Sequence, residues 1–145
     1  MVLQFLAAFC GTLAFSVFFR VPKKYFILTG LVGGIAWMVY IFIGVRLGHT
    51  TTGIFAAAFS AVLLSRCFAV LMKCPMNIFL LPGIFPLVPG ADIYYTAYYF
   101  VTKDYFRAAE SFTRAFECAF AIAIAISVGI LLPKSVFPGK RSNTQ

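Results

Sequence analysis

The residues that could bind a ligand gather in one stretch, residues 81–95, which reads LPGIFPLVPGADIYY. Prolines and glycines interrupt an apolar segment there, because each proline removes a backbone donor and clashes with the preceding helical turn. If a helix restarts after the interruption, its first N–H groups are unpaired and carry partial positive charge, which suits a carboxylate ligand. The candidate ligand-binding or gating residues are Pro82, Gly83, Pro86, Pro89, Gly90, Asp92, Tyr94 and Tyr95.

Asp92 is the only charged residue of residues 75–102, and it allows two interpretations. It follows Gly90 by two positions, so its short side chain can cap the restarted helix. Alternatively it binds a cationic group or a proton, because an acid inside a membrane is costly and usually faces a cavity. The tyrosines after it are either ligand hydroxyls or part of an aromatic belt at the membrane interface, which we favour for Tyr98 and Tyr99.

The remaining reactive side chains form no catalytic or metal-binding pattern. The sequence holds no paired acids, no Ser-His-Asp set and no nucleotide-binding glycine loop at usable spacing. The cysteines lack C-x-x-C and zinc-ligand spacing, which predicts free thiols buried in helices: Cys10, Cys67, Cys74 and Cys118. We therefore expect no enzyme, no cofactor and no metal.

The composition is that of an integral membrane protein. Hydrophobic residues make up 62% of the 145 residues and charged residues only 11%, about half the share of a soluble domain. The net charge of +8 does not indicate a nucleic-acid partner, because Lys and Arg cluster between long apolar runs. The predicted partner of this surface is a lipid bilayer.

Five membrane-spanning helices in a single all-α transmembrane domain account for the apolar runs. The fourth run is 28 residues long and would form a straight helix of about 42 Å, longer than the roughly 30 Å hydrocarbon core. Its prolines and glycines predict two half-helices or a re-entrant loop, whose free backbone groups need protein or a water-filled cavity around them. The predicted spans are 2–19, 25–45, 53–72, 75–102 and 115–132, followed by a basic polar tail at 133–145.

The positive-inside rule does not choose between five spans and four spans plus a re-entrant loop. Either arrangement puts eight of the twelve Lys and Arg on the inner side. We prefer five spans, with Arg66 snorkelling outward from the third. Residues 104–117 mix charged and aromatic residues and predict an amphipathic helix at the interface. Small residues at i, i+4 spacing predict close helix packing, as at Gly30 and Gly34.

Two segments resemble a known family. VPKKYFILTGLVGGIAW (residues 21–37) and PGIFPLVPGADIYYTAYY (residues 82–99) are similar to the small membrane subunit of the threonine/serine exporter family, which is related to two-component succinate exporters. The likeness covers most of the chain, and its most specific part is the P-x-x-P-G break. The family positions that carry over are Pro22, Gly30, Pro86, Pro89, Gly90 and Tyr94 or Tyr95; Asp92 departs from the small uncharged residue expected there.

The resemblance implies a unit that works with a second five-span membrane subunit and exports small amino acids or dicarboxylates across the bacterial plasma (inner) membrane. Size supports a partner independently, because five helices give too little wall to enclose a substrate path. A homo-oligomer would meet the same need. An odd number of spans would place a related unit in the opposite orientation, as in the inverted repeats of many transporters.

The leading functional hypothesis is a subunit of a secondary exporter for a small carboxylate-bearing metabolite, such as threonine, serine or succinate. The carboxylate of the metabolite would lie at the helix start after Pro89 and Gly90, and Tyr94 and Tyr95 would supply hydroxyl groups that bind it. Asp92 would contact an ammonium group or titrate. The alternatives are a structural or assembly subunit of a larger transporter and a small oligomeric channel lined by rings of Asp92.

Overall fold

The computed structural model describes residues 1–132, and every regular element in that range is a helix. The predicted basic tail, residues 133–145, lies outside these residues. Short 3-10 and π segments extend or join the α-helices at three places. The elements are α1 (Val2–Phe18), η1 (Lys23–Tyr25), α2 (Phe26–Tyr40), η2 (Ile41–Arg46), α3 (Thr50–Met72), α4 (Asn77–Ile84), η3 (Phe85–Leu87), α5 (Gly90–Val101) and α6 (Tyr105–Leu131).

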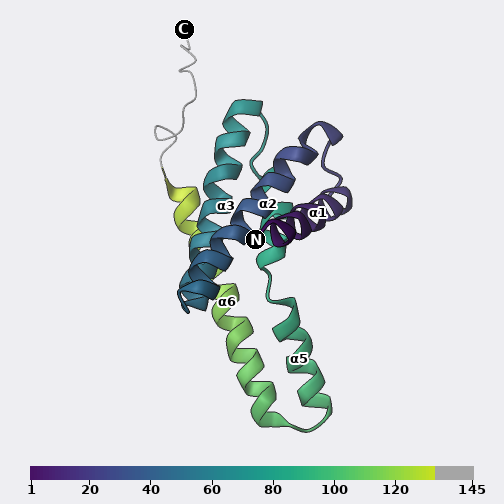
Figure 1. Cartoon of the computed structure of the whole chain (residues 1–145), viewed down its shortest axis with the longest axis vertical. Helices are drawn as coiled ribbons and strands as arrows, with labels where there is room; N and C mark the ends of the chain where they lie inside the picture. Colours follow the sequence, from purple (N-terminus) through teal and green to yellow (C-terminus); the bar gives the residue numbers. More distant parts are fainter. Residues whose placement is uncertain (133–145) are drawn as a thin grey trace.

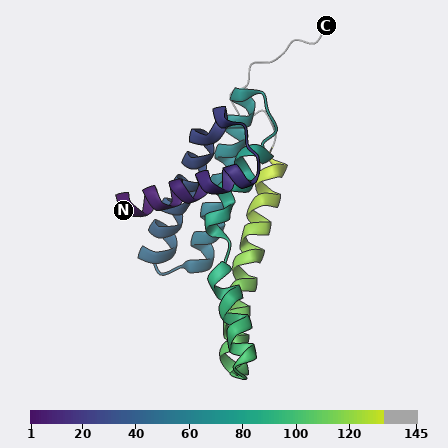
Figure 2. The same ribbon diagram turned by 90° about the vertical axis from the view of Figure 1, so that its right-hand side faces the viewer.

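The helices form a bundle and a hairpin that projects from it. In the bundle α2 packs on α3 and α4, α3 packs on α6, and α1 packs across α2 (Figures 1 and 2). The hairpin consists of α5 and the first half of α6, which run antiparallel and extend beyond the turn between α2 and α3 (Figure 1). No residue of α5 is buried. The α5 half of the hairpin is therefore poorly covered by the other helices of the chain.

Residues 104–117, predicted as a separate interfacial helix, are instead the beginning of one continuous helix, α6. Asp104 is its N-cap, and the Asp104 carboxylate accepts a hydrogen bond from the backbone N–H of Arg107 at 3.3 Å. The mixture of charges and aromatics arises because one side of this segment contacts α5 and the other does not. Composition alone does not distinguish such a two-sided helix from one lying flat on a membrane.

Three helical stretches are long and apolar enough to cross a membrane: Lys23–Arg46, Thr50–Met72 and Tyr105–Leu131. The pair Asn77–Leu87 and Gly90–Val101 bends by 49° at a short break and makes a fourth crossing if it acts as one span. α1 is apolar but has only 17 residues. The described residues thus form an all-helical, multi-span membrane protein with three or four candidate crossings, and the five-span arrangement stays a prediction.

Small residues bring the helices of the bundle together, as the i, i+4 spacing predicts. Ala57, Ala61 and Ala125 are fully buried where α3 meets its neighbours. A close approach of two backbones joins η2 to the first turn of α3, where a Cβ added to Gly53 would lie 2.5 Å from the Cα and N atoms of Gly44. Backbone therefore packs directly on backbone at this turn.

Arg66 ties α3 to the end of α6. The sequence predicts that its side chain snorkels outward; in the structure its Nη1 donates to the carbonyl oxygens of Gly129 at 2.6 Å and Ile130 at 3.2 Å. Carbonyls in the last turn of a helix have no partner within the helix. The guanidinium supplies one, which fixes the end of α6 against the middle of the bundle.

Substituting Gly53 should destabilise the protein, whereas substituting Gly11 should not. The new Cβ in Gly53→Ala meets backbone atoms that cannot rotate away, so we expect a loss of about 1–3 kcal/mol, the range of core overpacking. Gly11→Ala adds a Cβ with nothing within 4 Å and should be neutral or stabilising by up to about 1 kcal/mol through helix propensity. Unfolding of both variants in detergent micelles measures this. Equal stabilities would contradict the close crossing.

Candidate functional site

The helix break predicted from the prolines lies between Leu87 and Gly90. η3 ends at Leu87, and Val88 adopts an extended conformation with φ −64° and ψ 130°. The reason is local, since the residue before a proline avoids the α-helical region and Val88 precedes Pro89. Pro89 then stands at the N-cap of α5, a position where its missing N–H breaks no helical hydrogen bond. The break therefore separates two half-helices, α4 with η3 and α5.

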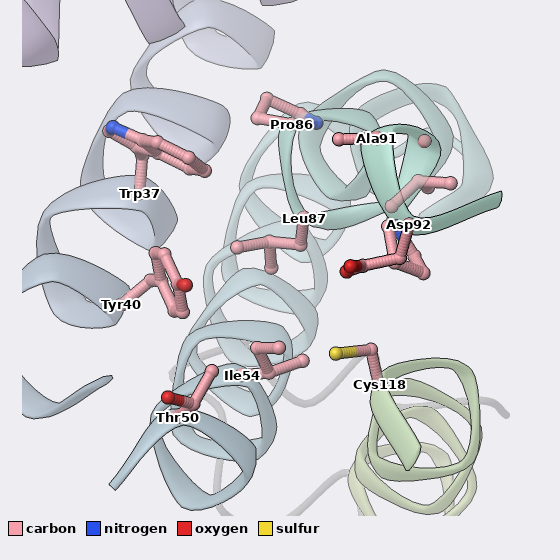
Figure 3. A pocket seen from close by; sticks show the side chains of 12 residues that line it. Trp37, Tyr40, Thr50, Ile54, Pro86, Leu87, Ala91, Asp92 and Cys118 are labelled. Atoms are coloured by element: carbon pink, nitrogen blue, oxygen red, sulfur yellow. The ribbon is translucent and has the colours of Figure 1, made fainter. Parts of the chain in front are cut away.

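A cavity of about 230 Å³ opens at this break (Figure 3). Its walls come from the end of α2, the start of α3, the break itself, the start of α5 and Cys118 of α6. Cys118 is the central residue of α6, so the cavity lies halfway along that helix, at the root of the hairpin. The lining residues are Trp37, Tyr40, Thr50, Ile54, Pro86, Leu87, Val88, Pro89, Gly90, Ala91, Asp92 and Cys118.

Among the residues of the described range 1–132 that line the cavity, Asp92 alone is charged. Its carboxylate and the Cys118 sulfur point toward the cavity, which the Tyr40 ring faces from the other side (Figure 3). The Asp92 side chain is 29% exposed, so the cavity reaches the surface. One Asp92 oxygen accepts a hydrogen bond from Arg114 Nε at 3.3 Å. Asp92 thus offers the cavity a carboxylate whose charge is balanced from outside it.

The capping interpretation of Asp92 is not what the structure shows. Asp92 does lie in the first turn of α5, where a negative charge is favourable, but no side chain caps this helix. The N–H of Gly90 donates to Val88 O at 2.8 Å and that of Ile93 to Pro89 O at 3.1 Å. Among the described residues no acceptor is recorded for the N–H groups of Ala91 and Asp92. These two donors stand at the positive end of the helix dipole.

Half of the predicted site residues are brought together at the cavity: Pro86, Pro89, Gly90 and Asp92. Pro82 and Gly83 lie elsewhere, buried inside α4, where a Cβ on Gly83 would lie 2.5 Å from Val32 Cγ1. Their place in the fold is helix packing against α2. The break comes about two helical turns after Pro82, at Val88 and Pro89.

Tyr94 and Tyr95 are not among the residues that line the cavity. They are 64% and 46% exposed on another face of α5. Tyr94 stacks along the helix on Tyr98 and Tyr95 on Tyr99, with ring centroids 6.3 and 6.0 Å apart. The four rings form one aromatic surface of the hairpin, exposed at Tyr94, Tyr95 and Tyr98 and half-buried at Tyr99, and the interface belt stays a prediction.

Sequence reasoning missed the part of the wall contributed by α2, α3 and α6. Trp37 and Tyr40 lie one helical turn apart, with ring centroids separated by 5.2 Å, and both line the cavity. Trp37 is the only tryptophan in the chain and falls in one of the two family-like segments, which was the available signal. Cys118 is buried and free, as expected, whereas the prediction of burial is wrong for Cys10, which is exposed. The position of Cys118 beside Asp92 had no signal in the cysteine spacing.

The arrangement is suited to binding rather than to bond-breaking chemistry. The cavity presents one carboxylate, the hydroxyls of Tyr40 and Thr50, and the start of a helix. Within residues 1–132 no group of three or more His, Cys, Asp or Glu could hold a metal ion. A second hollow of about 330 Å³ shares Trp37 and Pro86 with the first and reaches Gln4 of α1. These two residues therefore separate two adjoining spaces.

A family model described as the threonine/serine exporter ThrE matches residues 4–136 of the chain. The matched range contains the helix break and every residue of the cavity wall. No curated protein and no solved structure gives a match.

Small thiol reagents should reach Cys118 through the cavity. In a variant with Cys10, Cys67 and Cys74 replaced by alanine, we expect Ala91→Leu to slow the labelling of Cys118 severalfold, because Ala91 lines the cavity. Ala97→Leu changes the same helix at an exposed position away from this cavity and should leave the rate unchanged. Labelling rates by mass spectrometry decide. Equal slowing by both substitutions would contradict access by this route.

Proposed function

Because the chain belongs to the threonine/serine exporter ThrE family, we propose that it is the membrane-embedded subunit of a secondary exporter that carries a small amino acid through the cavity at the helix break. Membership establishes a transmembrane transport role of the threonine/serine exporter type. We further propose which residues hold the substrate, that transport is coupled as in a secondary exporter, and how the subunits are arranged.

The observation that carries the proposal is that a carboxylate and the start of a helix, which suit charges of opposite sign, lie together at one end of a small cavity. The Asp92 carboxylate offers a partner for an α-ammonium group. The unpaired N–H groups of Ala91 and Asp92 offer partners for an α-carboxylate. Broken helices bind substrate carboxylates in this way in other secondary transporters. The 230 Å³ lies below the roughly 300–1,000 Å³ of pockets for drug-sized ligands, as suits a small substrate.

This charge pattern favours an amino acid over a dicarboxylate such as succinate. A dicarboxylate would bring its second negative charge beside Asp92, and like charges held close together destabilise each other. An amino acid presents one charge of each sign. The side-chain hydroxyl of threonine or serine would find the hydroxyls of Tyr40 and Thr50 in the same wall. Tyr94 and Tyr95 then serve the exposed surface of the hairpin rather than the substrate.

A second membrane unit is part of the proposal. The hairpin projects beyond the bundle (Figure 2). The groove between α5 and α6 is almost entirely apolar. The cavity itself reaches the surface beside Asp92. These features support a second five-span unit that covers the hairpin and closes the path. With α1 and the bent pair each crossing the membrane, the chain has five spans, and a related partner would lie in the opposite orientation. We place the assembly in the bacterial inner membrane.

Asp92→Asn should impair threonine export by about tenfold or more in Vmax/KM. The amide keeps the shape of the side chain but removes the charge that pairs with the substrate ammonium, and bonds to charged groups contribute about 1.5–3 kcal/mol. Asp104→Asn removes an acid from the hairpin tip, where the Asp104–Arg107 pair is exposed, and should export normally. Uptake of labelled threonine by inside-out membrane vesicles measures both. Full activity of Asp92→Asn would refute the proposed site and favour a structural role for the break.

Export should require a second unit. We expect labelled threonine or serine to leave cells that contain this chain together with its partner faster than cells that contain either alone. Size-exclusion chromatography in detergent should show the two chains together. If the chain alone restores full export, a homo-oligomer replaces the two-unit arrangement. Ohmic ion currents in place of saturable threonine flux would instead indicate a channel.

A further inference from the structure

Arg114 is held by two carboxylates at once. Its Nε donates to Asp92 Oδ1 at 3.3 Å, across from α6 to α5, and its Nη1 donates to Glu110 Oε1 at 2.7 Å, one turn back on α6. A third, weaker contact joins Nη2 to the Ser111 hydroxyl at 3.3 Å. Because the two acids engage different nitrogen atoms, the guanidinium can lose one of them and keep the other.

The two carboxylates differ in what else they can bind. The Asp92 side chain is 29% exposed and lines the cavity, whereas the Glu110 side chain is 57% exposed and lies away from it. Arg114 does not line the cavity. Asp92 is therefore shared between the cavity on one side and Arg114 on the other. Any cation that enters the cavity must compete with Arg114 for the same carboxylate.

The presence of Glu110 makes this competition possible. A cation that loses its only ion-pair partner loses a stabilising interaction, even at an exposed position such as that of Arg114. Arg114 does not face that cost when it releases Asp92, because the shorter ion pair with Glu110 remains. The exchange replaces the guanidinium at Asp92 by the incoming ammonium and leaves every charge in the group paired.

We propose that Arg114 is an internal counter-ion that occupies Asp92 when the cavity is empty and moves fully onto Glu110 when the substrate ammonium binds Asp92. This inference rests on the proposed function and makes Arg114 and Glu110 positioning residues that set substrate affinity without touching the substrate.

The proposal predicts opposite effects from two substitutions in one ion-pair network. Arg114→Gln removes the competing cation, so the KM for threonine should fall. Glu110→Gln removes the alternative partner, so Arg114 stays on Asp92 and the KM should rise. Each change should be about two- to fivefold, the range expected of exposed ion pairs. The measurement is threonine uptake by inside-out membrane vesicles containing the transporter in its active, assembled form.

Arg107→Gln is the matched control. Arg107 belongs to the same helix and also pairs with an acid, Asp104, at 3.5 Å, but neither side chain lines the cavity. Its KM should equal that of the unaltered protein. Arg114→Lys keeps the charge with a smaller set of donors and should give a KM between those of Arg114→Gln and the unaltered protein, which guards against a folding defect in the neutral variant.

The outcomes separate this inference from the proposed function. KM values that move in the same direction for Arg114→Gln and Glu110→Gln, or that match Arg107→Gln, would overturn the exchange while threonine transport by the unaltered protein still stands. In an Asp92→Asn background neither substitution should alter the KM, because the contested carboxylate is gone. A persistent effect there would show that Arg114 acts elsewhere. If the unaltered protein shows no saturable threonine transport, the proposed function itself is rejected.

Discussion

Backbone groups inside a bilayer need hydrogen-bond partners, and the turn at Val88 and Pro89 is where the regular helical pairing of this chain stops. The rest of the structure accommodates that turn. Phe15 of α1 stacks on Phe85 just before it, with ring centroids 3.5 Å apart. α4 is held against α2 by the close contact of Gly83 with Val32. The half-helix that leads into the break is thus packed against both α1 and α2.

The placing of charged groups at the cavity depends on the same turn. Restarting the helix at Gly90 leaves unpaired N–H groups beside a hollow, and Asp92 adds a carboxylate at the same place. An acid there would be unfavourable alone, but Arg114 and Glu110 place it in a group of three charges that remain paired. A ligand that carries both an ammonium and a carboxylate matches this pattern better than one with a single kind of charge. Family membership and local chemistry therefore point to the same class of substrate.

The sequence predicted what depends on local rules and missed what depends on packing. The apolar runs located the long helices, and Pro89 located the break, because a proline acts on the residue beside it. The partner of Asp92 was not predictable, since Arg114 is 22 residues away and meets it only when α6 folds back on α5. Whether Tyr94 and Tyr95 face the cavity or the surface depends on the same packing of α6 on α5. Trp37 and Tyr40 of α2 share a wall with Cys118 of α6 only once these two helices have taken their places in the bundle.

The most direct measurement is the distance between bound threonine and Asp92 in lipid. Solid-state NMR can detect dipolar coupling between the ¹⁵N-labelled ammonium of threonine and a ¹³C-labelled aspartate carboxyl carbon in the assembled transporter. The account predicts a strong coupling that disappears in Asp92→Asn, as for an ammonium nitrogen about 2.8 Å from a carboxylate oxygen. Saturable threonine binding without that coupling would contradict the account, because the substrate would then lie somewhere other than the helix break.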